Sequence, residues 1–257
     1  MNGLKGKTVI ITGATGGIGK AIAETLAKEG MNLVIAARNK EMLEKIANEF
    51  SKKYKIKTLP VPCDVIKQTD LENLVNVAIK EFKKIDALIN SAGISSQYPF
   101  QEQPLEDIPR LMYTNYFGPV ILTRLIINHF IKNKAGAIIN IVSGSTLVDP
   151  PPRNFIVYTS LKRALRAFGK GLFWELRDFN IKVTSILPGV TDTALTQGLK
   201  DITLDKSRLM STKAIEDAVK FALTVPANVC PLEISVINQR TPWTRPVIPY
   251  KQEHPKK

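Results

Sequence analysis

Short apolar, β-branched runs alternate along the chain with longer segments whose apolar positions have helical spacing. The runs are Lys7–Thr12, Asn32–Ala37, Lys57–Pro62, Ala87–Asn90, Ala137–Val142, Lys182–Leu187 and Leu232–Ile237. Some are apolar almost throughout, as strands buried on both faces of a parallel sheet are. The alternation predicts an α/β fold: a doubly wound parallel sheet of about seven strands with helices on both faces.

The chain has 257 residues, of which 44% are hydrophobic, enough for one domain with a large core. We expect this domain to span residues 1–240 and to be followed by a Pro-rich extended arm over 241–257. Residues 194–211 mix leucines with charged residues, a pattern that suits a mobile lid over an apolar substrate or, alternatively, a short packed helix pair.

The formal net charge is +13, which raises the possibility of a protein that binds polyanions. The lysines are spread along the predicted helices and mixed with glutamates, as on ordinary solvated faces. No nucleic-acid-binding motif accompanies them, so we expect no specific nucleic-acid partner. A phosphate-bearing small molecule explains part of the charge better.

The apolar stretches contain polar or charged residues and stay shorter than the roughly 18 uncharged residues of a membrane span. Residues 1–7 lead directly into the first strand, with no visible secretory signal, so we expect a cytoplasmic protein without a membrane span. Cys63 and Cys230 have no Cys or His at ligand spacing, which predicts core thiols and no metal site.

A glycine-rich turn follows the first predicted strand and precedes a helical segment, in the order Thr12-Gly13-Ala14-Thr15-Gly16-Gly17-Ile18-Gly19. Glycines permit positive φ and close backbone approach, and a helix start offers free N–H groups and a positive dipole end to a pyrophosphate. The context predicts a Rossmann-like dinucleotide site with contacts from Gly13, Thr15, Gly17, Ile18 and Gly19.

The second strand ends at Arg38, where many dinucleotide folds carry an acidic residue that binds the ribose 2′-hydroxyl. A guanidinium there can grip a 2′-phosphate, which favours NADP(H) over NAD; the alternative is an exposed surface arginine. Asp64 and Val65 follow the third strand. Asp64 is a candidate contact to the adenine edge, or equally a helix or turn cap.

Tyr158 and Lys162 are separated by one helical turn, so in a helix a phenol and an ammonium share a face. A cation close to a phenol lowers the phenol pKa and makes the hydroxyl a usable acid or base near neutral pH. Such pairs also decorate solvated helix faces, so the spacing is weak evidence by itself.

Several segments together resemble the short-chain dehydrogenase/reductase family, from about residue 7 to residue 193. The matching segments are Thr12 to Gly19, Asn90-Ser91-Ala92-Gly93, Asn115 within Met112 to Gly118, the Tyr158/Lys162 pair, and Pro188-Gly189-Val190-Thr191-Asp192-Thr193. One asparagine of the family pattern is replaced by Ser91. The branch it most resembles is that of NADP(H)-dependent carbonyl reductases and 3-hydroxy acid dehydrogenases.

The resemblance implies a role for each matching residue. Tyr158 would exchange a proton with the carbonyl oxygen, Lys162 would lower the phenol pKa and bind the nicotinamide ribose, and Asn115 would hold a water of a proton relay. The cofactor contacts it implies are Asn90, Ala92, Gly93, Tyr158, Lys162, Pro188, Gly189, Val190 and Thr193. The alternative role for Thr193 is that of a helix cap.

Two hydroxyls compete for the position of the family's serine, which polarises the carbonyl. Strand position favours Ser143, whereas the usual separation from the tyrosine favours Ser145. We prefer Ser143, because a longer loop through Asp149–Arg153 can absorb the difference in spacing.

These features predict an oxidoreductase that transfers hydride between NADP(H) and a ketone, aldehyde or secondary alcohol. A non-catalytic dinucleotide-sensing protein and a 3-oxoacyl-thioester reductase are the alternatives. The chain shows Ile237-Asn238-Gln239 where the common family ending is Asp-Gly-Gly, which argues against the thioester reductase. The resemblance also implies a homo-oligomer, dimer or tetramer, packed through the helices that contain Asn115 and Tyr158.

Overall fold

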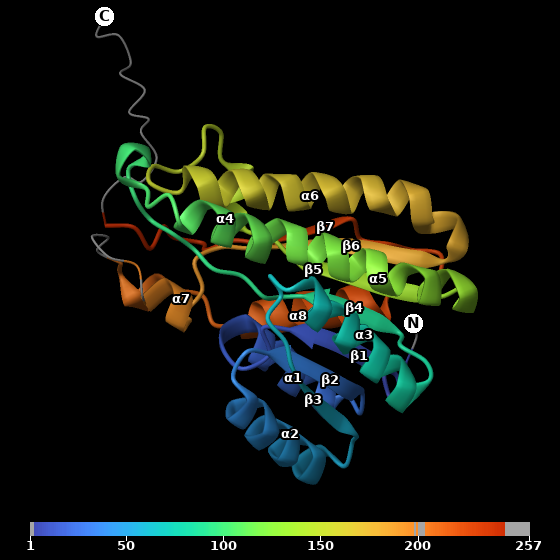
Figure 1. The fold of residues 1–257 in the computed structure, drawn as a ribbon. Helices are drawn as coiled ribbons and strands as arrows, with labels where there is room; N and C mark the ends of the chain where they lie inside the picture. Colours follow the sequence, from blue (N-terminus) through green and yellow to red (C-terminus); the bar gives the residue numbers. More distant parts are fainter. Residues whose placement is uncertain (1–2, 198, 200–203, 245–257) are drawn as a thin grey trace, which may run out of the picture.

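A seven-stranded sheet forms the centre of the molecule (Figure 1). The computed structural model describes residues 3–197, 199 and 204–244. The strands are all parallel and lie in the order β3-β2-β1-β4-β5-β6-β7. Their bounds are β1 Thr8–Thr12, β2 Asn32–Ala37, β3 Thr58–Pro62, β4 Ala87–Asn90, β5 Gly136–Ile141, β6 Ile181–Pro188 and β7 Glu233–Val236. The predicted Rossmann-like α/β fold is confirmed.

Helices cover both faces of the sheet, α1, α2 and α8 on one side and α3, α5 and α6 on the other (Figure 1). The helix bounds are α1 Gly17–Lys28, α2 Lys40–Tyr54, α3 Gln68–Phe82, α4 Asp107–Met112, α5 Gly118–Asn133, α6 Ile156–Leu176, α7 Ala194–Gln197 and α8 Lys213–Thr224. Because both faces are covered, every residue of β1 is buried, as its apolar run predicts.

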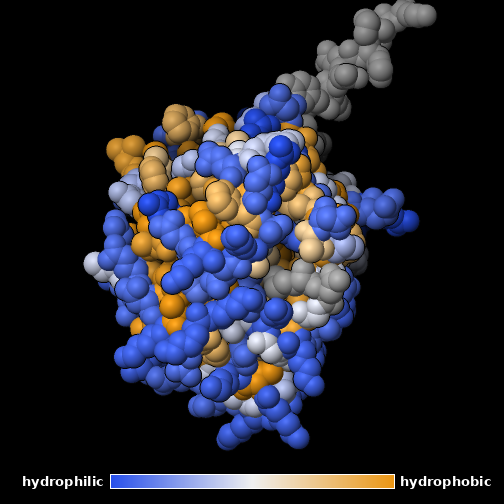
Figure 2. Space-filling view, turned by 90° about the vertical axis from the view of Figure 1, so that its right-hand side faces the viewer, coloured by the Kyte–Doolittle hydropathy of each residue, from blue (hydrophilic) through white to orange (hydrophobic). Residues whose placement is uncertain are grey.

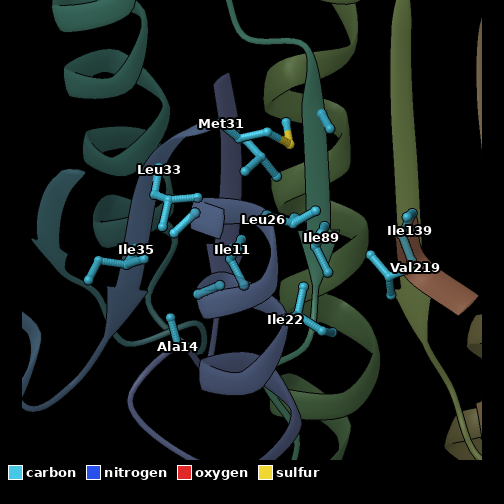
Figure 3. Close-up of a cluster of buried hydrophobic side chains, with 14 of the residues drawn as sticks. Ile11, Ala14, Ile22, Leu26, Met31, Leu33, Ile35, Ile89, Ile139 and Val219 are labelled. Carbon is cyan, nitrogen blue, oxygen red and sulfur yellow. The ribbon is translucent and has the colours of Figure 1, made fainter. Parts of the chain in front are cut away.

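The core on the α1 side joins side chains of strands and helices (Figure 3). Ile11 and Ile89 of the central strands pack against Ile22 and Leu26 of α1, and all four are fully buried. Burial of each such side chain contributes roughly 1.5–3 kcal/mol, so this contact fixes α1 firmly on the sheet. The start of α1 is therefore held at the carboxyl end of β1.

The strand order reverses between β1 and β4, because β2 lies on one side of β1 and β4 on the other. A crevice forms outside the carboxyl ends of the strands at such a switch point. Thr12 ties the two strand ends together there, since its Oγ1 accepts hydrogen bonds from the backbone N–H groups of Ser91 and Ala92, both at 3.1 Å.

Much of the positive charge lies on solvated faces. Figure 2 shows one of them, on the right-hand side of Figure 1: it is mainly hydrophilic, with hydrophobic residues in between. Some surface lysines form ion pairs with glutamates, for example Lys53 with Glu24 and Lys220 with Glu29. Within the described ranges, no helix is long and apolar enough to cross a bilayer.

The predicted lid, 194–211, begins with α7 and contains a 3₁₀ turn at Lys206–Arg208, whereas residues 198 and 200–203 lie outside the described residues. Leu204 bridges to Trp243, and Asp205 N–H donates to the backbone oxygen of Pro242 at 2.8 Å. The first residues of the predicted arm thus pack against the lid region. The rest of the arm, residues 245–257, lies outside the described residues.

Candidate active site

The glycine turn after β1 leaves no room for side chains at two positions. A Cβ at Gly13, whose φ is +69°, would lie 2.9 Å from Ala92 Cα, and one at Gly19 would lie 2.4 Å from Gly13 O. The chain passes so close to its neighbours that only glycine fits. A Cβ on Gly16 would meet nothing, so this side of the turn is open to a ligand.

Helix α1 begins at the turn with its N–H groups facing the cleft. Its N-cap, Gly16, makes no side-chain capping bond, and its first turn contains no acidic residue. Gly17, Ile18 and Gly19 line a cleft of about 460 Å³ together with Ser91, whose buried Oγ has no hydrogen-bond partner among the described residues. Free N–H groups, a positive dipole end and an unpartnered hydroxyl fit the pyrophosphate of a dinucleotide.

A second cavity of about 600 Å³ adjoins the turn on the β2 and β3 side. Its lining includes Thr15, Arg38, Asp64 and Val65, as predicted. Arg38 is exposed and makes no ion pair among the described residues, so its guanidinium is available to an anion. Asp64 Oδ1 accepts a bond from Ile66 N–H at 3.4 Å, the turn-capping role that was its alternative.

Tyr158 and Ser143 lie where the cofactor cleft meets a further cavity. Both residues line the cleft, and both line a neighbouring cavity of about 320 Å³. Pro188 and Gly189 also line both. A molecule in the cavity and a dinucleotide in the cleft therefore meet at the phenol.

Lys162 is a buried cation without an acidic partner among the described residues. It is 4% exposed, its Nζ lies 5.9 Å from the Tyr158 ring centroid, and it donates to Ile141 O at 3.0 Å. Burial lowers the pKa of the ammonium to about 8. Buried lysines usually pair with carboxylates, so an unpaired one that lines a cleft points to function.

The pKa of Tyr158 moves in the direction opposite to the sequence-based prediction. Burial raises the pKa of the phenol, and a hydrogen bond with Ser143 lowers it in part. The Lys162 ammonium donates to the backbone oxygen of Ile141, and burial outweighs any lowering of the phenol pKa by this cation. The phenol is therefore fully protonated at neutral pH.

Ser143 and Ser145 both line the neighbouring cavity together with Tyr158, and of the two only Ser143 also lines the cleft. Ser143 Oγ donates to Ser145 Oγ at 3.0 Å. Ser145 instead accepts a bond from Thr159 Oγ1 at 3.2 Å, and its N–H donates to Ser143 Oγ at 3.1 Å. Ser145 lines the neighbouring cavity but not the cleft, and its two hydrogen bonds to Ser143 orient the Ser143 hydroxyl.

Asn115 lies in a π-helical turn, Tyr113–Phe117, between α4 and α5. Such turns are frequent at functional sites. The side chain is fully buried, and its Nδ2 donates to Ile94 O at 2.9 Å and Leu111 O at 3.1 Å. A Cβ on Gly93 would lie 3.2 Å from Asn115 Oδ1 and 3.5 Å from Lys162 Nζ, so both polar atoms border the same point of the cleft.

Asn90 is not among the residues that line the cleft, and its expected contact with the cofactor stays a prediction. It is 2% exposed, and its Nδ2 donates to Asn140 Oδ1 at 2.9 Å and Thr123 Oγ1 at 3.3 Å. Ala92 and Gly93 do line the cleft, together with Ser91, to which the motif assigned no contact.

The loop after β6 forms one wall of the cleft. Thr193 lines the cleft and also caps α7, because its Oγ1 accepts from Thr196 N–H at 3.5 Å. Val190, an expected cofactor contact, lines the neighbouring cavity instead. Asn238 fixes this loop: its Oδ1 accepts from Val190 N–H at 2.7 Å, and its Nδ2 donates to Val190 O at 2.9 Å.

Several lining residues were missed by motif reasoning, among them Asn238, Phe155 and Trp243. The replacement of Asp-Gly-Gly by Ile237-Asn238-Gln239 was the available signal for Asn238. The cysteines offer no reactive group, since burial raises the pKa of the Cys63 thiol to about 12. Within the described part of the chain, no three His, Cys, Asp or Glu side chains gather as a metal site.

Comparison with known proteins agrees with this geometry. The family model described as short chain dehydrogenase matches residues 7–202. An uncharacterized oxidoreductase of Staphylococcus epidermidis is 31% identical over 91% of this chain and 97% of its own length. The chain belongs to the short-chain dehydrogenase family, and it is an oxidoreductase of that family by descent.

Solved structures show the same fold with nicotinamide cofactors. A 3-ketoacyl-(acyl-carrier-protein) reductase from Brucella melitensis, complexed with NADH, is 28% identical, with a TM-score of 0.83 over 92% of this chain and 99% of that one. L-Sorbose reductase from Gluconobacter frateurii, complexed with NADPH and L-sorbose, is 27% identical, with a TM-score of 0.83 over 92% and 97%. A nicotinamide dinucleotide is therefore the cofactor class.

Proposed function

We propose that this protein is an NADP(H)-dependent oxidoreductase that reduces a ketone or aldehyde and oxidises the corresponding alcohol in reverse. The observation that carries the proposal is that Tyr158 and Ser143 line both the cleft and the neighbouring cavity, beside Lys162, a buried cation without an acidic partner among the described residues. A protein that only senses dinucleotides has no need to keep an acid, a hydroxyl donor and a buried cation together at this junction.

The protein's own side chains supply the proton chemistry. The reduced nicotinamide, when bound, supplies the hydride that the carbonyl carbon receives. Tyr158 holds its proton at neutral pH and gives it to the carbonyl oxygen as the C=O electron pair moves onto that oxygen. Ser143 donates a hydrogen bond to the same oxygen, and a preorganised donor of this kind contributes roughly 3 kcal/mol. One carbonyl, one NADPH and one proton become one alcohol and one NADP⁺.

Lys162 serves the reaction through charge and proton exchange. Its ammonium is charged at neutral pH and stabilises the phenolate that Tyr158 leaves behind. With a pKa of about 8 it also exchanges protons readily near physiological pH, so it can return a proton to the phenolate. In this proposal Asn115 holds the water of the relay to Lys162.

The preference for NADP(H) rests on Arg38, which lines both the cleft of about 460 Å³ and the cavity of about 600 Å³ on the β2 and β3 side. Arg38 is exposed and makes no ion pair among the described residues. Arg38→Ala is expected to raise KM for NADPH by about 10- to 100-fold, the loss of one charge-assisted contact, and to leave KM for NADH unchanged. Arg124→Ala, on an exposed position of α5, is the control for lost charge. Equal losses for both cofactors would overturn the preference.

A 3-oxoacyl-thioester reductase is the second candidate, because the solved Brucella melitensis reductase is 28% identical. The activity test is therefore a panel of ketones, aldehydes and a 3-oxoacyl thioester, with NADPH and NADH carrying deuterium at the reactive ring carbon. We expect deuterium on the carbinol carbon of the alcohol that is formed from a ketone or aldehyde. No labelled alcohol from any carbonyl compound would refute the proposal, and label only from the thioester would favour the second candidate.

Assembly and location are further parts of the proposal. The helical region that contains Asn115 and the helix that contains Tyr158 expose large apolar side chains, including Tyr113, Phe117 and Trp174, which a second copy of the chain would cover. A homo-oligomer, dimer or tetramer, should therefore appear in light scattering. Both described cysteines are free, as in a reducing compartment, and we propose a cytoplasmic location.

A further inference from the structure

The cavity beside Tyr158 and Ser143 has a volume of about 320 Å³, at the lower end of the range for small-molecule sites. Most of the side chains that line it are apolar, and its polar groups are hydroxyls and one amide. Among the described lining residues, Tyr158 is the only ionisable one. This is unusual in a chain with a net charge of +13, because cations are abundant elsewhere.

Three arginines beside the cavity wall are engaged in contacts outside the cavity. Each donates to a backbone oxygen of the wall or of the segment beside it, and each pairs with a carboxylate. The contacts are Arg163 with Val148 O and Asp149, Arg166 with Thr146 O and Glu233, and Arg208 with Thr241 O and Asp205. Their charges are neutralised outside the cavity. Arg153 and Arg240 adjoin the lining residues Pro152 and Thr241, but both are exposed and neither belongs to the lining.

A carboxylate in this cavity would lose its water, and no lining residue that the structure describes offers it a cation. Such a transfer is strongly unfavourable, and hydroxyl and amide donors offset only part of the cost. A neutral ketone loses little when it enters and gains from burial of its apolar groups. The lining therefore selects by charge as well as by shape.

The outer wall is aromatic. Phe155, just before α6, and Trp243, from the first residues after β7, lie with ring centroids 6.3 Å apart at 54°. Trp243 is positioned by its bridge to Leu204 and by the bond of Arg208 to Thr241 O at 3.2 Å. Two tilted rings over an apolar cavity favour a substrate that itself carries a ring, through offset or edge contacts.

We propose that the substrate is an uncharged ketone whose carbonyl carries a bulky apolar, ring-bearing group, and that ketones with a carboxylate beside the carbonyl are excluded. The proposal rests on the proposed function, because it places the reacting carbonyl at Tyr158. It favours the carbonyl reductases over the 3-hydroxy acid dehydrogenases within the branch that the sequence resembles.

The first test compares a methyl ester with the corresponding carboxylate, two substrates of similar size and different charge. With NADPH, kcat/KM for methyl phenylglyoxylate should exceed that for phenylglyoxylate by about 100-fold, because only the second carries a carboxylate. Val148→Arg, which places a cation in the lining, should narrow this ratio. Equal or better turnover of the carboxylate by the unchanged protein would overturn the proposal.

The second test reads binding without turnover, so that it separates this proposal from the proposed function. The chain has two tryptophans, and Trp174 lies on α6, 59% exposed and stacked with Arg177. In a Trp174→Phe variant, Trp243 alone reports on the cavity. In the presence of NADP⁺, the neutral ester should change Trp243 fluorescence at concentrations about 100-fold below those the carboxylate requires.

The two tests have separable outcomes. Ester binding without any labelled alcohol would refute the proposed function and leave the substrate class standing. No response of Trp243 to the ester, or an equal response to the carboxylate, would overturn the substrate class. Trp243→Ala should lower kcat/KM for the aryl ester at least about 10-fold and leave a small aliphatic ketone within about two-fold. Equal losses for both ketones would contradict the preference of the aromatic wall for a ring-bearing substrate.

Discussion

Replacement of Lys162 by methionine is expected to make protein stability less dependent on pH. Burial lowers the pKa of this ammonium from 10.5 to about 8, so the folded state disfavours its charged form. The difference corresponds to roughly 3 kcal/mol at neutral pH. Methionine has a similar length and no charge, and it removes this cost.

The sign of the effect follows from proton binding. Between about pH 8 and about pH 10.5 the unfolded chain holds the lysine proton and the folded protein does not, so the free energy of unfolding rises with pH. The cost is fully present below about pH 8 and is relieved above it. Methionine also leaves Ile141 O without its donor, a loss of roughly 1–3 kcal/mol that does not depend on pH.

Urea unfolding at about pH 7 and about pH 9.5 measures the effect directly. The free energy of unfolding of Lys162→Met, relative to the unchanged protein, should fall by roughly 2 kcal/mol between these values. Lys52→Met, at an exposed position of α2, is the control for removal of a lysine as such. A difference for Lys162→Met that stays constant over this range would refute the reasoning.

Three further predictions concern the chemistry and its scaffold. The value of kcat/KM for carbonyl reduction should decline above about pH 8, because Lys162 loses its charge while Tyr158 stays protonated; a flat profile to about pH 9.5 would contradict this. Gly19→Ala should lower both the melting temperature and NADPH affinity, since its Cβ would lie 2.4 Å from a backbone oxygen, whereas Gly171→Ala, on open space in α6, should stabilise by up to about 1 kcal/mol. Asn238→Ala should raise KM for the carbonyl substrate and lower stability by roughly 1–3 kcal/mol, because it frees the loop at Val190. An unchanged stability in calorimetry would exclude the role of Asn238 in holding this loop.

The fold was predictable because its signals are local. Strands buried on both faces leave continuous apolar runs, and each of the expected runs agrees with a strand to within one residue at either end. The glycine turn was also predictable from the sequence, because Gly13 and Gly19 lie where the backbone approaches its neighbours too closely for a Cβ. The spacing of Tyr158 and Lys162 placed both residues on α6 and at the same cleft.

What the sequence left open depends on distant contacts. Asn238 holds a loop 48 positions earlier in the chain, and Trp243 meets Phe155 only after the C-terminal segment folds back over the cavity. The pKa of Tyr158 was predicted in the wrong direction because spacing shows which charges are near but not how deeply a phenol is buried.

The central claim is that Tyr158 delivers the proton during hydride transfer, and single-turnover reduction by Tyr158→Phe tests it most directly. The variant should bind NADPH with unchanged affinity and lose at least about 100-fold in the rate of alcohol formation, whereas Tyr113→Phe, on the neighbouring helical segment, should keep the full rate. Alcohol formation by Tyr158→Phe at a near-normal rate would contradict the assignment.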